Sequence, residues 1–269
     1  MNIKSMKIGM IGAGNLASHL APALQAAGHE IVAVYSRTQA SADALAAKVG
    51  APAWVSVEQL PEADVYIFSV RDDALHMLVD EFCPRHSEAL FLHTAGSMPM
   101  SVFGAVARRY GVLYPMQTFS KSRAVDFRRI PCFVEGCTPE VCAEVEALAA
   151  QISDTVMPLD SDKRRALHLA AVFACNFANH CYAEAARLVE GVGIPFSTFL
   201  PLIDETAAKV HELSPVQAQT GPAVRFDRKV MQRQLELLGD LGAKRIYEAM
   251  SEQIHAFATS SQNGADKQS

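Results

Sequence analysis

The stretch KIGMIGAGNLASHLAPAL, residues 7–24, decides the fold. An apolar run ends there in a glycine-rich turn, and a helical pattern follows at once. Gly12, Gly14 and Ala17 fit the G-x-G-x-x-G/A pattern, in which the first glycine permits a tight turn, the second lets backbone approach a diphosphate, and the third position allows close helix–strand packing. The free N–H groups that begin the helix suit phosphates. The predicted dinucleotide-binding loop comprises Gly12, Ala13, Gly14, Asn15 and Leu16.

The end of the next apolar run predicts which dinucleotide is bound. IVAVY, residues 31–35, is followed by Ser36, Arg37 and Thr38, and no carboxylate occurs between Glu30 and Asp43. NAD-binding proteins usually place an acidic residue here for the ribose 2′-OH, whereas an arginine suits a 2′-phosphate. The sequence therefore predicts NADP(H). The alternative is that Arg37 is a solvated loop residue and Thr38 only a helix cap.

Two further strand ends are predicted to face the cofactor, because ligands bind outside the carboxyl ends of strands in this type of sheet. Runs at residues 65–70 and 89–94 have the apolar, β-branched and aromatic character of strands. The residues expected to line the crevice are Ser69, Val70, Arg71, Thr94, Ala95 and Gly96. His93 is left open between a structural and a functional role.

The hydrophobic periodicity of the sequence changes near residue 160 and predicts two domains. Up to residue 159, short strand-like runs alternate with helical stretches, which predicts a doubly wound parallel sheet of the Rossmann type. From residue 160 only helical periodicity remains, beginning with one long helix over 161–191. We therefore expect an NADP-binding domain at 1–159, an all-α substrate and dimerisation domain at 160–260, and a frayed polar tail at 261–269. Thr138 and Asp227 are predicted helix caps.

Composition excludes several classes of function. The 269 residues carry a net charge of -5 with no basic stripe, so a nucleic-acid partner is not expected. No apolar run reaches the roughly 20 residues of a membrane span, and no signal peptide is recognisable, which predicts a cytoplasmic protein. The six cysteines lack metal-ligand spacing, so we expect reduced thiols and no metal.

One face of the long helix carries the candidate catalytic groups. At about 100° per residue, Asn179 lies about 20° and Asn176 about 80° from His168, among apolar neighbours. Reduction of a C=O or C=N bond needs a proton donor and groups that hold the acceptor. We predict His168 as the acid and Asn176 and Asn179 as orienting residues; the alternative is that all three make structural hydrogen bonds.

Two other segments could contribute to a substrate site. Lys121 and Arg123 could attract an anionic substrate, and Thr220, Gly221 and Arg225 could contact it, although each segment is also compatible with a solvated loop. The basic residues 163–165 are interpreted as a solvated first turn of the long helix.

Several segments together resemble a known family. They are GMIGAGNLA (9–17), SRT (36–38), HTAGS (93–97), YPMQTFS (114–120), HLAAVFACNFANH (168–180) and TGPAVRFD (220–227). They resemble a group of bacterial Rossmann-like proteins described as candidate NADP oxidoreductases, over nearly the whole chain. The group is similar to pyrroline-5-carboxylate reductases, ketopantoate reductases and β-hydroxyacid dehydrogenases. The resemblance implies a 6-phosphogluconate-dehydrogenase-like helical domain that forms a homodimer and closes the active site.

The sequence departs from two of these relatives at the catalytic lysine, which β-hydroxyacid dehydrogenases and ketopantoate reductases carry on this long helix. Val172 and Cys175 stand near the corresponding turn here, and Lys163 lies about 140° from His168. We therefore predict an NADPH-dependent reductase of a small, carboxylate-bearing carbonyl or imine compound, acting in the interdomain cleft with His168 as acid. The alternative is an NADP(H)-binding regulatory or interaction protein without turnover.

Overall fold

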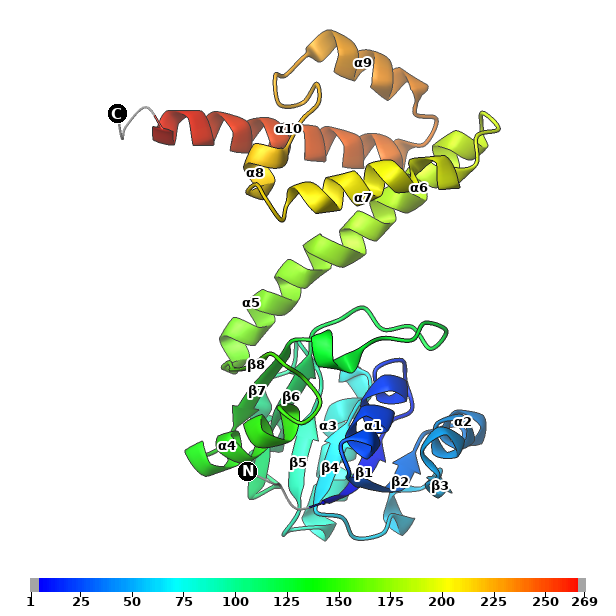
Figure 1. Cartoon of the computed structure of the whole chain (residues 1–269), viewed down its shortest axis with the longest axis vertical. Helices are drawn as coiled ribbons and strands as arrows, with labels where there is room; N and C mark the ends of the chain where they lie inside the picture. Colours follow the sequence, from blue (N-terminus) through cyan, green and yellow to red (C-terminus); the bar gives the residue numbers. More distant parts are fainter. Residues whose placement is uncertain (1–4, 266–269) are drawn as a thin grey trace. The chain divides into compact units, whose positions relative to one another are not determined.

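The computed structural model describes residues 5–265, with side chains described to residue 260. Eight strands form one sheet in the order β3-β2-β1-β4-β5-β6-β7-β8 (Figure 1). The strands are β1 (Lys7–Ile11), β2 (Glu30–Tyr35), β3 (Ala53–Trp54), β4 (Val65–Phe68), β5 (Leu90–His93), β6 (Arg109–Pro115), β7 (Cys132–Gly136) and β8 (Val156–Pro158). The predicted Rossmann-type sheet is thereby confirmed, with β3 as a short strand that the sequence analysis missed.

One pair of strands departs from the predicted parallel arrangement. β7 pairs with β6 antiparallel, while all other pairs are parallel. Parallel neighbours need a crossover, usually a helix. The link between β6 and β7 contains only the 3-10 turn η4 (Phe127–Arg129), so the chain returns beside β6 in the opposite direction.

Strand residues alternate between two cores, as expected for side chains that point to opposite faces. The helices of this unit are α1 (Ala17–Ala26), α2 (Gln39–Val49), α3 (Asp72–Phe82) and α4 (Pro139–Ala149), with 3-10 turns η1 (Val57–Gln59), η2 (Cys83–Arg85) and η3 (Met100–Phe103). In β4, Val65 and Ile67 belong to the core under α1, α2 and α4, whereas Tyr66 and Phe68 belong to the core under α3 (Figure 1). Both faces of the sheet are therefore covered.

The predicted long helix is continuous along the chain but not uniform. It comprises α5 (Ser161–Ala171), a π-helical segment η5 (Val172–Phe177) and α6 (Ala178–Glu190). The chain divides into two compact units, up to residue 177 and from residue 178, instead of at residue 160. The difference arises because α5 packs on the sheet: Arg164 is fully buried, and Leu167 packs against Val112 and Tyr114.

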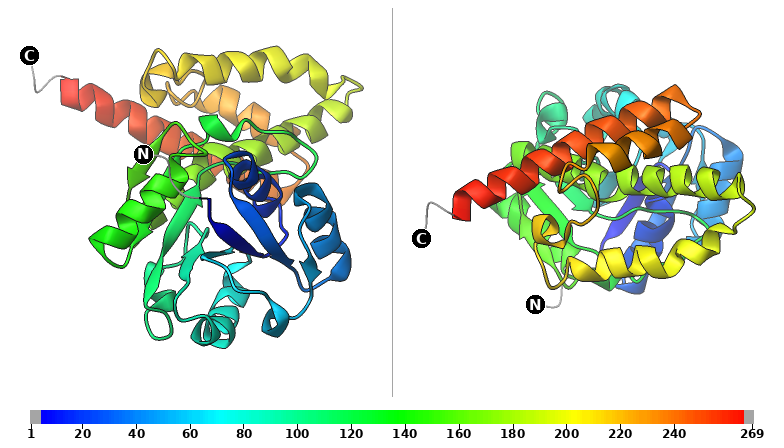
Figure 2. Two further views of the ribbon diagram at one scale, coloured as in Figure 1. Left: turned by 60° about the horizontal axis from the view of Figure 1, so that its bottom comes forward. Right: turned by 90° about the horizontal axis from the view of Figure 1, so that it is seen from above.

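The second unit is helical, as predicted. It contains α6, the 3-10 turn η6 (Phe196–Phe199), α7 (Leu200–Lys209), α8 (Pro215–Ala218), α9 (Arg228–Leu237) and α10 (Leu241–Ala265). Residues of α6 and α10 line one cavity, and the two helices run close together in both views of Figure 2. No helix within residues 5–265 is long and apolar enough to cross a membrane.

The structure confirms the two helix caps that the sequence predicts. Thr138 accepts from the Val141 N–H, and Asp227 accepts from the Val230 N–H, so both predicted caps are confirmed. α10 continues to Ala265, which lies within the segment 261–269 for which a frayed tail is predicted. Side-chain bonds within the helix, such as Ser260 Oγ to Ala256 O (2.8 Å), are compatible with its helical continuation. Residues 266–269 of the predicted tail lie outside the described residues.

Candidate cofactor and active site

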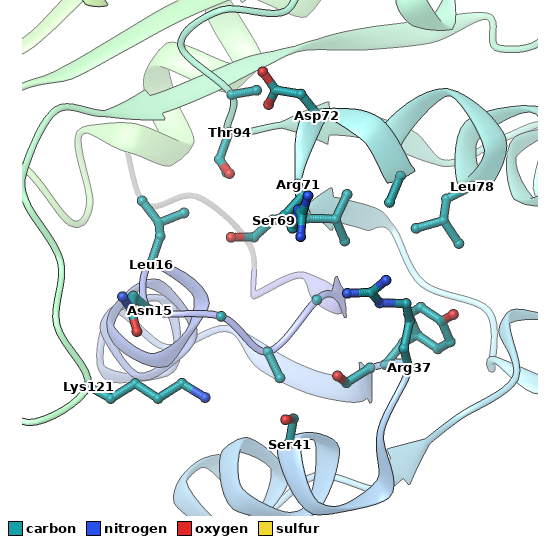
Figure 3. Close-up of a pocket in the computed structure, with 18 residues that line it drawn as sticks. Asn15, Leu16, Arg37, Ser41, Ser69, Arg71, Asp72, Leu78, Thr94 and Lys121 are labelled. Carbon is teal, nitrogen blue, oxygen red and sulfur yellow. The ribbon is translucent and has the colours of Figure 1, made fainter. Parts of the chain in front are cut away.

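A pocket of about 580 Å³ opens at the carboxyl ends of β1, β2, β4 and β5 (Figure 3). The strand order places β1 between β2 and β4, which is the point where connections leave in opposite directions and where ligands bind in such sheets. Of the predicted cofactor residues, all except Thr38 and Gly96 line this pocket. The additional lining residues are Tyr35, Ser41, Asp72, Ala74, Leu78 and Lys121.

The glycine loop has the backbone that the sequence pattern requires. Gly12 has φ +117°, and a Cβ atom there would collide with the Ser69 carbonyl. The Gly12 N–H donates to Tyr35 O (2.8 Å), which ties the loop to the end of β2. A side chain at this position would therefore strain the backbone and displace the end of β4.

The helices that begin at this pocket lack side-chain caps. Leu16, Thr38 and Arg71, which precede α1, α2 and α3, make no capping hydrogen bond. By contrast α4 and α5 are capped by Thr138 and Asp160. The amides at the start of α1 are therefore available to a bound anion, which fits the diphosphate of a dinucleotide.

The charged residues of the pocket are mostly cationic. Arg37 and Lys121 form no ion pair with any described residue, whereas Arg71 pairs with Asp73 at 2.9 Å. The one carboxylate in the lining, Asp72, accepts a hydrogen bond from Ser97. Together with the uncapped helix, these two unpaired cations fit a ligand with several phosphate charges.

Thr38 does not line the pocket, and it does not cap α2 either. Its hydroxyl donates to Ser41 Oγ (2.9 Å), and Ser41 lines the pocket in its place. Ser41 could not be singled out from the sequence, because a serine in the first turn of a helix carries no distinctive pattern.

His168 lies directly against the loop that follows β5. A Cβ atom on Gly96 would approach His168 Cγ and Nδ1 to 2.6 Å, so only glycine allows this contact. The Tyr114 hydroxyl lies 3.0 Å from His168 Nδ1, with the rings edge to face at a centroid distance of 6.0 Å. The fold therefore brings together two predicted site residues, His168 and Gly96, and adds Tyr114, which the sequence analysis had not singled out.

The Tyr114–His168 contact is compatible with a neutral His168 that carries its proton on Nε2. Burial raises the pKa of Tyr114, so its hydroxyl keeps its proton and can donate to Nδ1. Neutral His168 then carries its own proton on Nε2, the ring atom left free by Tyr114. To give a proton to a substrate, His168 has to be an imidazolium, in which Nδ1–H donates to the Tyr114 hydroxyl and the Nε2–H is left free.

His93 is excluded as an acid near neutral pH. Burial, with the charge of Arg164 as a second cause, lowers the pKa of His93 to about 3. Its Nδ1 accepts from the Ala95 N–H at 3.2 Å, which fixes the turn after β5. This geometry favours the structural alternative for His93.

Next to these residues lies a buried ion pair that the sequence did not predict. Arg164 is fully buried and pairs with Glu135 of β7, and its Nη2 also donates to Met98 O (2.6 Å). The interpretation of residues 163–165 as a solvated turn is therefore wrong for Arg164, because this position faces the sheet. Lys163 and Arg165 are exposed, as expected.

The π-helical segment affects the prediction of Asn176 and Asn179, which assumed the angular spacing of a regular α-helix. A π turn is wider than an α turn, so the spacing of about 100° per residue does not hold between residues 172 and 177. Asn176 lies in this segment and Asn179 in the second unit, and both side chains are exposed. Their roles stay predictions. Single π turns in helices are frequent at functional sites.

The remaining candidates lie elsewhere. Arg123 and Arg225 are exposed, and neither lines a described pocket. Thr220 lines a cavity of about 400 Å³ within the second unit, together with His180 and Tyr247. No group of three or more His, Cys, Asp or Glu side chains in the described part of the chain could hold a metal ion.

Comparison with known proteins places the chain in a family. A candidate NADP oxidoreductase of Bacteroides fragilis, known as a crystal structure, is 49% identical over 94% of this chain and 98% of its own, with a TM-score of 0.90. The chain belongs to this NADP oxidoreductase family. Residues 7–92 also match a family model described as "NADP oxidoreductase coenzyme F420-dependent", and residues 130–254 match a domain of unknown function. The curated proteins contain no match.

More distant structures share the fold of this NADP oxidoreductase. A protein from Thermotoga maritima is 20% identical over 94% of this chain and 99% of its own, with a TM-score of 0.77. A reductive aminase from Aspergillus terreus, solved with NADPH and ethyl-5-oxohexanoate, is 18% identical over 97% and 95%, with a TM-score of 0.64. At these identities the similarity concerns the fold alone.

Proposed function

We propose that this oxidoreductase reduces a small carbonyl or imine compound with NADPH, and that His168 supplies the proton. The observation that carries the proposal is the contact of His168 with Gly96, which puts a proton-carrying ring at the carboxyl end of β5 beside the pocket loops. NADPH, when bound, supplies the hydride; the protein has to orient the acceptor and protonate it.

The residues of the pocket fit NADP(H). The uncapped start of α1 would hold the diphosphate, and Gly14 leaves room for its approach. Arg37 would bind the 2′-phosphate through charge-assisted hydrogen bonds. Thr94 and Ala95, at the end of β5, would lie along the nicotinamide half.

Tyr114 and His168 would act together in the proton transfer. As the imidazolium, His168 would donate Nδ1–H to the Tyr114 hydroxyl and would transfer its Nε2 proton to the acceptor atom of the substrate, which leaves a neutral imidazole. When neutral His168 carries its proton on Nε2, the same hydroxyl can turn and donate to Nδ1, since a phenol both donates and accepts. Tyr114 therefore provides a hydrogen-bond partner for Nδ1 in either protonation state.

The proposal is tested by NADPH oxidation with a panel of small α-keto acids and cyclic imines. Turnover that His168→Ala removes would support it. Tight NADPH binding with no turnover of any compound would instead favour the regulatory alternative.

Arg37→Ala is expected to lower the affinity for NADPH about 10- to 100-fold, the equivalent of one charge-assisted interaction, and to leave NADH affinity nearly unchanged. Isothermal titration calorimetry with both cofactors measures this ratio. Gln39→Ala is the matched control, because Gln39 lies two residues from Arg37, does not line the pocket and bonds Asp43 instead. An unchanged ratio in Arg37→Ala would refute the assignment of Arg37 to the 2′-phosphate.

We further propose a homodimer formed through the helical unit. Within its described side chains, only Ala223, Ala243 and Ser251 are buried, while Leu237 is 81% and Val192 70% exposed. Apolar surface on this scale marks an interface. Sedimentation is expected to give twice the mass of one chain, and Leu237→Arg to shift it toward the monomer; a monomeric wild type contradicts the proposal.

Two finer features belong to the same proposal. All six cysteines are free thiols, which supports a cytoplasmic location because that compartment keeps thiols reduced. The carboxylate-bearing character of the substrate was inferred from Lys121 and Arg123. Lys121 lines the cofactor pocket and therefore does not support a carboxylate on the substrate. Comparison of keto acids with their esters in the substrate panel tests whether the enzyme requires this carboxylate.

A further inference from the structure

A loop from the far half of the sheet reaches the cofactor pocket. Residues 116–126 connect β6 to the turn η4, and Lys121 of this loop lines the same pocket as Gly14, Arg37 and Ser41. In Figure 3, Lys121 extends toward the glycine loop from the side opposite Arg37. This placement differs from the substrate role considered for Lys121 from the sequence.

The loop is held in place by the helix that begins at the pocket. His19 of α1 donates from Nε2 to Ser120 O at 2.9 Å, and its ring stacks on Phe119 with a centroid distance of 5.5 Å. Phe119 in turn stacks on the buried Phe127 at 6.1 Å. The residues on the N-terminal side of Lys121 are therefore anchored, although Lys121 itself is exposed.

A tight turn presents the lysine. The Arg123 N–H donates to Ser120 O (3.2 Å), and the hydroxyls of Ser120 and Ser122 lie 2.9 Å apart. Lys121 occupies the tip of this turn and forms no ion pair with any residue between 5 and 260. Its ammonium group is thus free for a ligand in the pocket.

Charge balance indicates what that ligand group is. A diphosphate at the start of α1 meets free amides and the positive end of a helix dipole. A phosphate monoester carries about -1.5 to -2 charges at neutral pH, and Arg37 alone balances about one of them. Arg71 is engaged by Asp73, which leaves Lys121 as the other unpaired cation of the lining.

We infer that Lys121 is a second 2′-phosphate-binding residue, which acts with Arg37 and Ser41 and makes the pocket selective for NADP(H). The inference rests on the proposed function, since it requires that the pocket holds this cofactor. It adds a specificity determinant that lies more than eighty residues from the glycine loop and from the end of β2.

The test compares the affinities of NADPH, NADH and 2′,5′-ADP by isothermal titration calorimetry for the wild type and Lys121→Ala. We expect NADPH and 2′,5′-ADP to bind about tenfold more weakly to the variant, as for one lost charge-assisted interaction at an exposed site, and NADH to change less than about twofold. Lys121→Arg should restore most of the affinity. Arg123→Ala, which removes an exposed cation of the same turn outside the pocket, should bind like the wild type.

The outcomes separate this inference from the function on which it rests. If the wild type binds neither nicotinamide cofactor, the proposed function fails. If the wild type binds NADPH but Lys121→Ala binds it equally well, or weakens NADH as much as NADPH, only the assignment of Lys121 to the 2′-phosphate is overturned. Thermal melts of each variant verify that the fold is retained.

Discussion

Replacement of Arg164 by alanine is expected to lower the free energy of unfolding of the sheet unit by about 3 to 5 kcal/mol, the usual cost of breaking a buried ion pair from one side. Arg164 is fully buried, and Glu135 beside it retains the hydrogen bonds from Ser161 N (3.0 Å) and Oγ (2.8 Å). Without the guanidinium, the Glu135 carboxylate is left with an unbalanced charge. The Met98 carbonyl also loses its donor.

Urea unfolding measures this effect cleanly, because Trp54 is the only tryptophan of the chain and lies in β3 of the sheet unit. Its fluorescence therefore follows that unit even if the helical unit unfolds separately. Lys163→Ala and Arg165→Ala are matched controls on the same helical turn. Their ion pairs are exposed, so each should cost less than about 1 kcal/mol. A loss for Arg164→Ala no larger than that of the controls would contradict the structural role of the pair.

The contrast between Arg164 and its neighbours shows which kind of feature could not be predicted from the sequence. Three consecutive basic residues at a helix start look alike in the sequence, and solvation is the ordinary fate of each. Which of them faces inward depends on where β7 places Glu135, twenty-nine residues earlier in the chain. That information is tertiary, so no local pattern could single out Arg164.

The glycine loop was predictable for the opposite reason. Its conformation is set by local requirements, a positive φ at Gly12 and a helix that follows at once, and these leave a signature within a few residues. The chain's lack of an acidic residue after β2 is equally local. The loop, the strand order around β1 and most helix ends could therefore be predicted from the sequence.

Contacts between residues on different strands could not be predicted from the sequence. Tyr114 and Lys121 lie on or after β6, and they contribute to the site only because β6 pairs with β5 and because His19 anchors the following loop. The π-helical segment at 172–177 could not be predicted because its residues, VFACNF, continue the mostly apolar pattern of the neighbouring helix and carry no local signal for a wider turn. The angles between His168, Asn176 and Asn179 hold only for a uniform α-helix, which this chain does not have.

His168→Ala is expected to reduce kcat by about 100- to 10,000-fold with any compound of the panel that the enzyme turns over, the range found when a general acid is removed. The cofactor affinity should stay near that of the wild type, because His168 does not line the dinucleotide pocket. Calorimetry with NADPH and steady-state NADPH oxidation together separate these two effects. Loss of binding and turnover in parallel would assign His168 to the cofactor site instead.

Tyr114→Phe should have a smaller effect on the same step, up to about tenfold in kcat, because it removes one hydrogen bond while the imidazole remains. The variant should also change the proton distribution between the two ring nitrogens, which ¹⁵N chemical shifts of His168 report without any substrate. Tyr110→Phe is the matched control, since Tyr110 lies on the same strand and its ring packs against Phe103 instead. A shifted tautomer with slower turnover in Tyr114→Phe alone would establish Tyr114 as a positioning residue, whereas an unchanged tautomer would show that the 3.0 Å contact does not set the protonation of His168.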